Sequence, residues 1–180
     1  MSVYPIKIAA TIDEKQLRKG TFLFIYRATR IPPHIGVITN GLLYDITSVG
    51  PNIELSVADF YKTAVKRKTE VLFVELDLPS EDTNRIISEK VKQHWKVTAT
   101  KSCLAPVKEF LEEVCSVDLQ KATFLFDLLP VLEKAKLVNG VYELNLQKKI
   151  NNDVFELIKY SQQDIEACIN ALNRKEQFSC

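Results

Sequence analysis

Apolar and polar residues follow two different periods along this chain, and both periods recur several times. Apolar runs of strand length, either continuous or alternating, fall at residues 21–27, 34–39, 42–46, 69–78 and 141–146. Apolar spacings of three and four residues, typical of amphipathic helices, fall at 56–68, 79–96, 102–117, 119–138 and 152–174. We therefore expect an α+β fold in which a small antiparallel sheet packs against helices.

Capping and turn residues predict how the first elements begin and end. Residues 6–17 are predicted to start as a short edge strand and to become a turn of helix, with Thr11 as N-cap and Glu14 completing a capping box. Ser56 is the predicted N-cap of the helix that follows it. Residues 49–53 contain glycine, proline and asparagine in succession, which favours a loop.

A hairpin at residues 34–46 places a histidine beside a carboxylate. Asn40 and Gly41 separate two strands of β-forming residues and can take the positive φ values of a tight hairpin turn. The first strand begins at His34, directly after two prolines that hold the backbone extended. If the turn pairs the strands, His34 lies within cross-strand reach of the segment from Asp45 to Thr47.

The length of the chain predicts one domain. A chain of 180 residues and 20.5 kDa can bury most of its apolar surface in a single core. The sequence contains no internal repeat or low-complexity linker that would divide it. We expect residues 19–115 to form the core of the domain and residues 119–180 to form a helix-rich C-terminal extension packed on it.

Charge and composition exclude several classes of partner. The chain has 24 Lys and Arg against 23 Asp and Glu, and its one basic run, at 62–68, fits a solvated helix end. We therefore expect no nucleic-acid partner. The five glycines are scattered singly, so no phosphate loop is present, and we expect no nucleotide cofactor. The start of the chain resembles neither a secretory signal nor a transmembrane span, which favours a cytoplasmic protein.

The four cysteines point away from disulfides and metals. Their positions, 103, 115, 168 and 180, are widely and irregularly spaced, with no CxxC motif and no neighbouring Cys or His pair. We expect free thiols and no metal site. A thiol becomes a nucleophile as thiolate, and a helix N-terminus together with an imidazole stabilises that form. Cys103 occupies the start of a predicted helix, with Ser102 near the cap.

These residues could form a catalytic triad or could each serve the fold alone. Cys103 would be the nucleophile, His34 the base, and Asp45 the group that orients the imidazole ring. If the three residues serve only the fold, Cys103 is a small buried hydrophobe, His34 is bonded to backbone, and Asp45 caps a strand end. The sequence permits the triad, because such a triad is assembled in space and not along the chain.

Four short motifs carry a family resemblance over Lys19 to Val114. They are the segment KGTFLF at 19–24, HIGV at 34–37, the Asn40-Gly41 turn followed by Tyr44-Asp45, and Cys103 at a helix start with Val107 after it. In this the chain resembles the NlpC-like, papain-fold cysteine hydrolases in their circularly permuted form. Those include lecithin:retinol acyltransferase-like enzymes, YiiX-like bacterial proteins and the PPPDE deubiquitinase-like group.

The resemblance implies a permuted papain-like fold and a thiol-dependent hydrolase or acyltransferase of the cysteine peptidase type. It implies Cys103 as nucleophile, His34 as base and Asp45 as orienting group. An oxyanion hole would use the backbone N–H of Cys103 and a second donor, for which Tyr26 on the preceding strand is a candidate. The chain departs from the family pattern at Thr21, where many members have Asp, at Ser102, where acyltransferase relatives have Asn, and in lacking a Glu after the cysteine.

Two other readings of the chain stay open at this point. One is a binding or regulatory module that keeps the papain-like fold without the chemistry. The other is an unrelated α+β domain in which the hairpin merely pairs strands. A peptide, a lipid ester or a modified protein would each suit an acyl-transfer site, and the sequence leaves the oligomeric state open.

Overall fold

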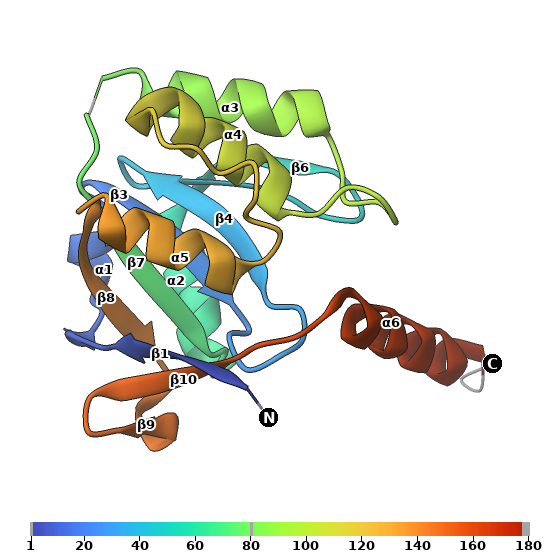
Figure 1. Cartoon of the computed structure of the whole chain (residues 1–180). Coiled ribbons are helices and arrows are strands. Elements are labelled where there is room, and N and C mark those ends of the chain that lie inside the picture. Colours follow the sequence, from blue (N-terminus) through green and yellow to red (C-terminus); the bar gives the residue numbers. More distant parts are fainter. Residues whose placement is uncertain (1, 80, 178–180) are drawn as a thin grey trace.

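A computed structural model describes residues 2–79 and 81–177 of the chain, and within them the strands form two sheets (Figure 1). The larger sheet has seven strands in the order β2-β8-β7-β3-β4-β5-β6 and is antiparallel except where β2 pairs with β8. The smaller sheet has three antiparallel strands in the order β1-β10-β9. The α+β class expected from the sequence is therefore confirmed.

The element bounds are as follows. The strands are β1 Val3–Lys7, β2 Ala10–Thr11, β3 Thr21–Tyr26, β4 His34–Thr39, β5 Leu42–Ile46, β6 Pro51–Ser56, β7 Val71–Leu76, β8 Val138–Leu144, β9 Ile150–Asn151 and β10 Val154–Ile158. The helices are α1 Glu14–Leu17, α2 Val57–Lys66, α3 Thr83–His94, α4 Leu104–Cys115, α5 Leu125–Lys134 and α6 Gln162–Gln177, with a short 3₁₀ turn at Gln147–Lys149.

The large sheet is the middle layer of three. Figure 1 shows α3, α4 and α5 on one face and α2 on the other. Side chains that alternate along each strand supply both cores. Leu23 and Ile25 pack with α3, α4 and α5, whereas Phe22 and Phe24 pack toward α1 and α2. The continuous apolar run of β3 thus follows from its central place, because β3 is covered on both faces and pairs with β4 and β7.

The hairpin of β4 and β5 forms at the predicted turn. Asn40 and Gly41 have φ values of 51° and 79°, and Thr39 pairs with Leu42 across the turn. Ser56 also caps α2 as predicted, since its side-chain oxygen accepts a hydrogen bond from the N–H of Asp59 at 3.3 Å. Local turn and cap chemistry therefore fixes the elements on either side of β6.

Three local predictions were wrong. The cap of α1 is Asp13 and not Thr11, because Asp13 accepts from the N–H of Gln16 at 2.8 Å. Residues 51–56, predicted in part as a loop, form the edge strand β6 that pairs with β5. The helix predicted at 119–138 begins only at Leu125. Thr11 instead ends β2, and residues 119–124 form turns and loop before α5 begins.

Residues 119–180 are less helical than predicted. Strand β8 lies inside the large sheet between β2 and β7, and β10 pairs with β1 from the start of the chain. The single helix predicted at 152–174 is a strand, β10, followed by α6. Its spacing of apolar residues fits both periods over a short stretch, and pairing with β1 decides in favour of the strand.

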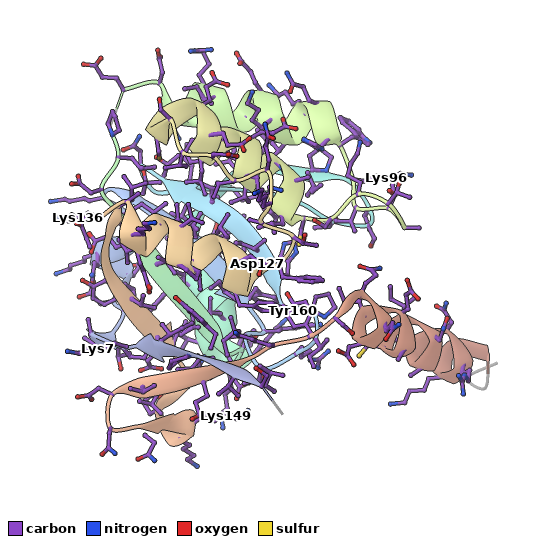
Figure 2. All side chains as sticks on the ribbon, in the orientation of Figure 1. Lys7, Lys96, Asp127, Lys136, Lys149 and Tyr160 are labelled. Atoms are coloured by element: carbon purple, nitrogen blue, oxygen red, sulfur yellow. The ribbon has the colours of Figure 1, made fainter. Side chains whose placement is uncertain are left out.

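Helix α6 stands apart from the layers. Figures 1 and 2 show it extending sideways from the body, with most of its side chains directed outward and Tyr160 just before its start. The side chains of Ile169 and Leu172 are 48% and 60% exposed. None of the helices in the described ranges is both long and apolar enough to cross a membrane.

Candidate active site

The first strand of the hairpin presents His34 to a carboxylate on the second. His34 opens β4, and its Nε2 lies 2.7 Å from Oδ2 of Asp45 on β5. The carboxylate is buried, with 6% of the residue exposed. The predicted proximity of His34 and Asp45 is confirmed, and a buried carboxylate bonded to one ring nitrogen fixes the orientation of the imidazole.

Asn52 on β6 holds the same carboxylate from its other side. Its Nδ2 donates to Oδ1 of Asp45 at 2.7 Å, and the two residues are paired across the sheet where a bulge follows Leu43. Sequence reasoning missed Asn52, because residues 49–53 were predicted to be a loop. A strand assignment for 51–56 would have placed it opposite Asp45.

The glycine of the HIGV motif makes room beneath the histidine. A Cβ on Gly36 would lie 2.5 Å from the ring of Phe24 and 2.6 Å from the backbone oxygen of Tyr44. The Phe24 ring occupies that space and meets the His34 ring at a centroid distance of 6.0 Å, tilted by 59°. Gly36 therefore allows an aromatic ring to pack against the imidazole.

Gly36→Ala is expected to lower the free energy of unfolding by about 3 kcal/mol, because the added methyl group overpacks a buried contact that includes backbone. Chemical denaturation monitored by circular dichroism measures the change. Gly140→Ala is the matched control, since its Cβ would meet the hydroxyl end of Tyr142 at 3.2 Å and that side chain can shift. Equal stability of Gly36→Ala and the wild type would contradict the packing argument.

Cys103 is at the predicted start of α4, but as its N-cap residue, whereas the sequence predicted Ser102 near the cap and Cys103 in the first turn. The residue is half-buried and its thiol is free. Ser102 supports the helix start, because its Oγ accepts from the N–H of Leu104 at 3.3 Å. The backbone N–H of Cys103 itself donates to no carbonyl or side chain within the ranges that the structure describes. A free N–H and the positive end of the helix dipole thus accompany the sulfur.

The three predicted residues meet through the imidazole ring. The His34 ring is bonded to Asp45 at 2.7 Å, and the Cys103 thiol lies close enough to the ring to affect its pKa. Burial lowers the pKa of His34, but the hydrogen bonds with Asp45 and Cys103 and the negative charges of both groups outweigh it and raise the pKa to about 10. This environment favours the imidazolium form of His34 at neutral pH.

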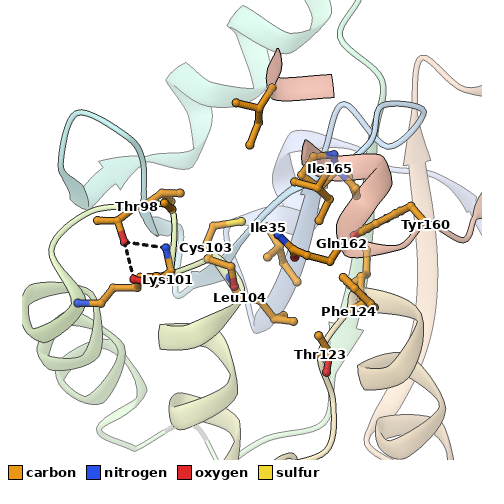
Figure 3. Close-up of a pocket in the computed structure, with 18 residues that line it drawn as sticks. Ile35, Thr98, Lys101, Cys103, Leu104, Thr123, Phe124, Tyr160, Gln162 and Ile165 are labelled. Carbon is orange, nitrogen blue, oxygen red and sulfur yellow. Dashed lines mark hydrogen bonds between the residues drawn. The ribbon is translucent and has the colours of Figure 1, made fainter. Parts of the chain in front are cut away.

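Cys103 opens into a cavity of about 410 Å³, which we call the thiol cavity. Figure 3 shows the sulfur facing a space bordered by β4, by the segments before α4 and α5, and by the start of α6. The lining is mainly apolar and includes Ile35, Leu104, Phe124, Leu125, Ile165 and Ile169. An apolar wall beside a nucleophile suits an apolar group on the substrate.

Two residues of this lining were missed in the sequence. Tyr160 is buried, and burial, followed by the charges of Cys103 and Asp127, raises the pKa of its hydroxyl. Gln162 lines the same cavity, and in Figure 3 its side chain extends from the start of α6 in the direction of Cys103. Both residues lie in the segment that was predicted as uninterrupted helix, so no turn between β10 and α6 was expected there.

Tyr26 is not part of the thiol cavity. It lies at the end of β3 and lines two other cavities, one of about 570 Å³ and one of about 270 Å³. Its predicted role as oxyanion donor beside Cys103 therefore has no geometric support. The strand that carries Tyr26 does neighbour β4, but the ring of Tyr26 meets the Phe60 ring at a tilt of 49°, on the opposite side of the sheet from α4.

His34 also borders the larger of these two cavities, which we call the histidine groove. Its lining includes Asp45, Asn52, Phe60 and Arg67. The Cys103 side of the pair thus lines the thiol cavity, and the His34 side lines the histidine groove. Such an arrangement can receive the two parts of a scissile group on different sides of the pair.

The second histidine has a structural environment. Nε2 of His94 lies 2.9 Å from Oε1 of Glu109, which links α3 to α4. No group of three or more His, Cys, Asp or Glu side chains that could hold a metal ion occurs in residues 2–79 and 81–177. The side chains of His34, Asp45 and Cys103 can perform proton transfer and nucleophilic attack.

Comparison with known proteins assigns the chain to no family. No family model, curated protein or solved structure matches the chain.

Proposed function

We propose that the chain is a thiol-dependent hydrolase or acyltransferase that cleaves an amide, isopeptide or ester through an acyl-Cys103 intermediate. The observation that carries the proposal is the placement of the His34 ring between Cys103 and Asp45, with Asp45 held in turn by Asn52. A nucleophile, a base and a group that orients the base are the parts such a reaction needs. The order of histidine before cysteine supports the circularly permuted papain-like type.

The first half of the reaction transfers the acyl group to sulfur. His34, as imidazolium, already holds the proton that the Cys103 thiol gives up, and the resulting thiolate attacks the carbonyl carbon, forming a carbon–sulfur bond. The negative charge that develops on the carbonyl oxygen is stabilised by the free N–H of Cys103 at the start of α4. The imidazolium of His34 then gives its proton to the leaving nitrogen or oxygen, whose bond to the carbonyl carbon breaks.

The second half releases the acyl group. Water, or the hydroxyl or amine of an acceptor, gives a proton to His34 as it attacks the thioester carbon. The carbon–sulfur bond breaks, and His34 returns the proton to the sulfur of Cys103. Water as acceptor makes the protein a hydrolase, and another nucleophile makes it an acyltransferase. Asp45 keeps the ring in place during both halves.

The walls of the thiol cavity support an apolar acyl group. The side chains that face the sulfur include Ile35, Phe124, Leu125 and Ile165. A fatty acyl ester, an acylated protein or a peptide with an apolar residue next to the scissile bond would bury apolar surface there. We place the reaction in the cytoplasm, where reducing conditions keep a nucleophilic thiol reduced.

The experiment that tests the function is labelling of the full chain with a tagged aliphatic acyl thioester, followed by peptide mass spectrometry. We expect Cys103 to be acylated at least about tenfold faster than Cys115 and Cys168, because only Cys103 has a histidine partner and a free helix start. His34→Ala is expected to remove that preference. His94→Ala is the matched control and should keep it, since His94 pairs with Glu109 instead.

Equal acylation of all cysteines would overturn the proposal and favour the alternative, a non-catalytic binding module with the same fold. The same conclusion would follow if His94→Ala and His34→Ala reduced the labelling of Cys103 equally. In that case the loss would reflect general destabilisation and not removal of a base.

A further inference from the structure

Four cationic side chains surround a small cavity that adjoins the histidine groove. Arg27 and Arg30 come from the loop after β3, and Arg67 and Lys68 from the end of α2. They line a cavity of about 270 Å³, which we call the basic cavity. The two loops are joined by a hydrogen bond of 3.2 Å from the N–H of Ala28 to the carbonyl oxygen of Glu70. The four charges are therefore held together by backbone pairing.

These cations have no carboxylate partner among the described residues. No ion pair joins Arg27, Arg30, Arg67 or Lys68 to an acidic side chain of residues 2–79 or 81–177. Arg27 instead lies over the ring of Tyr26, with 5.4 Å from its Cζ to the ring centroid. In a chain with a net charge of only +1, this is a local concentration of unpaired positive charge.

The one carboxylate in the cavity wall is engaged elsewhere. Glu70 binds Nζ of Lys149 at 2.6 Å through one oxygen and the hydroxyl of Thr29 through the other. Burial raises the pKa of Glu70, but the hydrogen bonds with Lys149 and Thr29 and the charge of Lys149 outweigh it and lower the pKa. Since Lys149 balances the charge of Glu70, the charge of the four cations stays uncompensated.

The basic cavity adjoins the proposed catalytic site through shared walls. Tyr26 and Arg67 line both the basic cavity and the histidine groove. His34 lines that same groove, whereas Cys103 lines the thiol cavity. A ligand bound at the basic cavity can therefore extend along the groove to the imidazole that protonates the leaving group.

We propose that the basic cavity binds a phosphate group, and that this phosphate is carried by the leaving or accepting part of the substrate. The position of that part rests on the proposed function, whereas phosphate binding does not. A carboxylate carries one charge and is satisfied by a single arginine, but a phosphate carries up to two charges and several acceptor oxygens. Three arginines and a lysine around one cavity match the phosphate.

Binding is tested by titrating the full chain with inorganic phosphate at constant ionic strength, monitored by amide chemical shifts. We expect the largest shifts at residues 26–30 and 67–70. The double variant Arg30→Gln with Arg67→Gln is expected to weaken binding roughly tenfold or more, because it removes two charge-assisted hydrogen bonds. Arg174→Gln is the matched control, an exposed arginine on α6 outside both cavities.

Four results would overturn phosphate binding. The first is an absence of shifts on titration, the second is shifts spread evenly over the surface, and the third is equal loss in the double variant and in Arg174→Gln. Binding of a polyanion such as DNA without any response to phosphate would also overturn it, since the cavity would then serve a polymer. None of these measurements depends on acyl transfer, so they stay informative if the proposed function fails.

Two further arms identify where the phosphate comes from. Displacement of inorganic phosphate by glycerol phosphate indicates a soluble phosphate ester. Sedimentation with phosphatidylcholine vesicles only when they contain phosphatidic acid, lost in the double variant, indicates a lipid headgroup.

If acyl transfer is observed, kcat/KM for a thioester with a phosphate on its leaving group should exceed that for a neutral thioester. The double variant should reduce this ratio roughly tenfold, and an unchanged ratio would show that the phosphate is not on the leaving group.

Discussion

Cys103→Ala is expected to reduce turnover of an aliphatic thioester by roughly ten-thousandfold or more, because removal of a nucleophile removes the covalent route entirely. The variant should still fold, since the side chain is only half-buried and lies at a helix start. Turnover is followed as thiol release, and folding is checked by the thermal unfolding midpoint. Cys103→Ser should also be nearly inactive, because a hydroxyl is not ionised by a neighbouring histidine as a thiol is.

Cys115→Ala is the matched control for this loss. Cys115 ends the same helix, α4, and is also half-buried, but burial raises the pKa of its thiol to about 11. At neutral pH it is therefore a poor nucleophile and should be dispensable for turnover. If Cys103→Ala retained most of the activity, or if Cys115→Ala lost as much, the acyl-Cys103 intermediate would be excluded.

The parts of this site that the sequence predicted are those governed by local chemistry. The Asn40-Gly41 turn fixes the register of β4 and β5, and that register alone brings His34 to Asp45. Ser102 and the helix period similarly place Cys103 at a helix start. The approach of Cys103 to His34 was left open, because it depends on how α4 packs across the sheet.

The parts that the sequence did not predict depend on pairing between distant segments. Asn52 reaches Asp45 because residues 51–56 pair with β5, although their glycine and proline neighbours favour a loop. Tyr160 and Gln162 reach the thiol cavity because β10 pairs with β1, which ends the predicted helix. A short apolar segment fits either period, so only the partner strand decides between them.

The two cavities give the proposed reaction a direction that the triad alone lacks. The thiol cavity offers apolar walls to the group that stays on sulfur, and the histidine groove leads to a cluster of cations. A substrate with an apolar acyl part and a charged leaving part would be bound in one orientation only. Orientation of this kind makes the reacting atoms meet with less loss of entropy at the transition state.

Asp45→Asn is expected to lower the pKa of His34 by about one to three units, because it removes the buried negative charge next to the ring. The pKa of His34 is raised to about 10 in the folded chain, so the wild-type kcat/KM should fall on the alkaline side only near that pH. In the variant this alkaline limb should move to lower pH. The amide of the variant also cannot keep both hydrogen bonds of Asp45, because it has one oxygen where His34 and the Nδ2 group of Asn52 each bond to one.

Asp45→Asn should also change how the free energy of unfolding depends on pH. A histidine whose pKa is higher in the folded than in the unfolded chain contributes stability that is fully present below its unfolded pKa of about 6.5 and is lost as pH rises through the folded value. Asp45→Asn should therefore lower the free energy of unfolding by about 1 to 4 kcal/mol at pH 6. The difference between variant and wild type should shrink as pH rises toward 10. Denaturant titrations at several pH values measure this difference in the free energy of unfolding. Asp59→Asn is the control, since Asp59 lines the groove but makes no side-chain contact with His34. A difference that grows with pH would show that His34 is neutral in the folded chain.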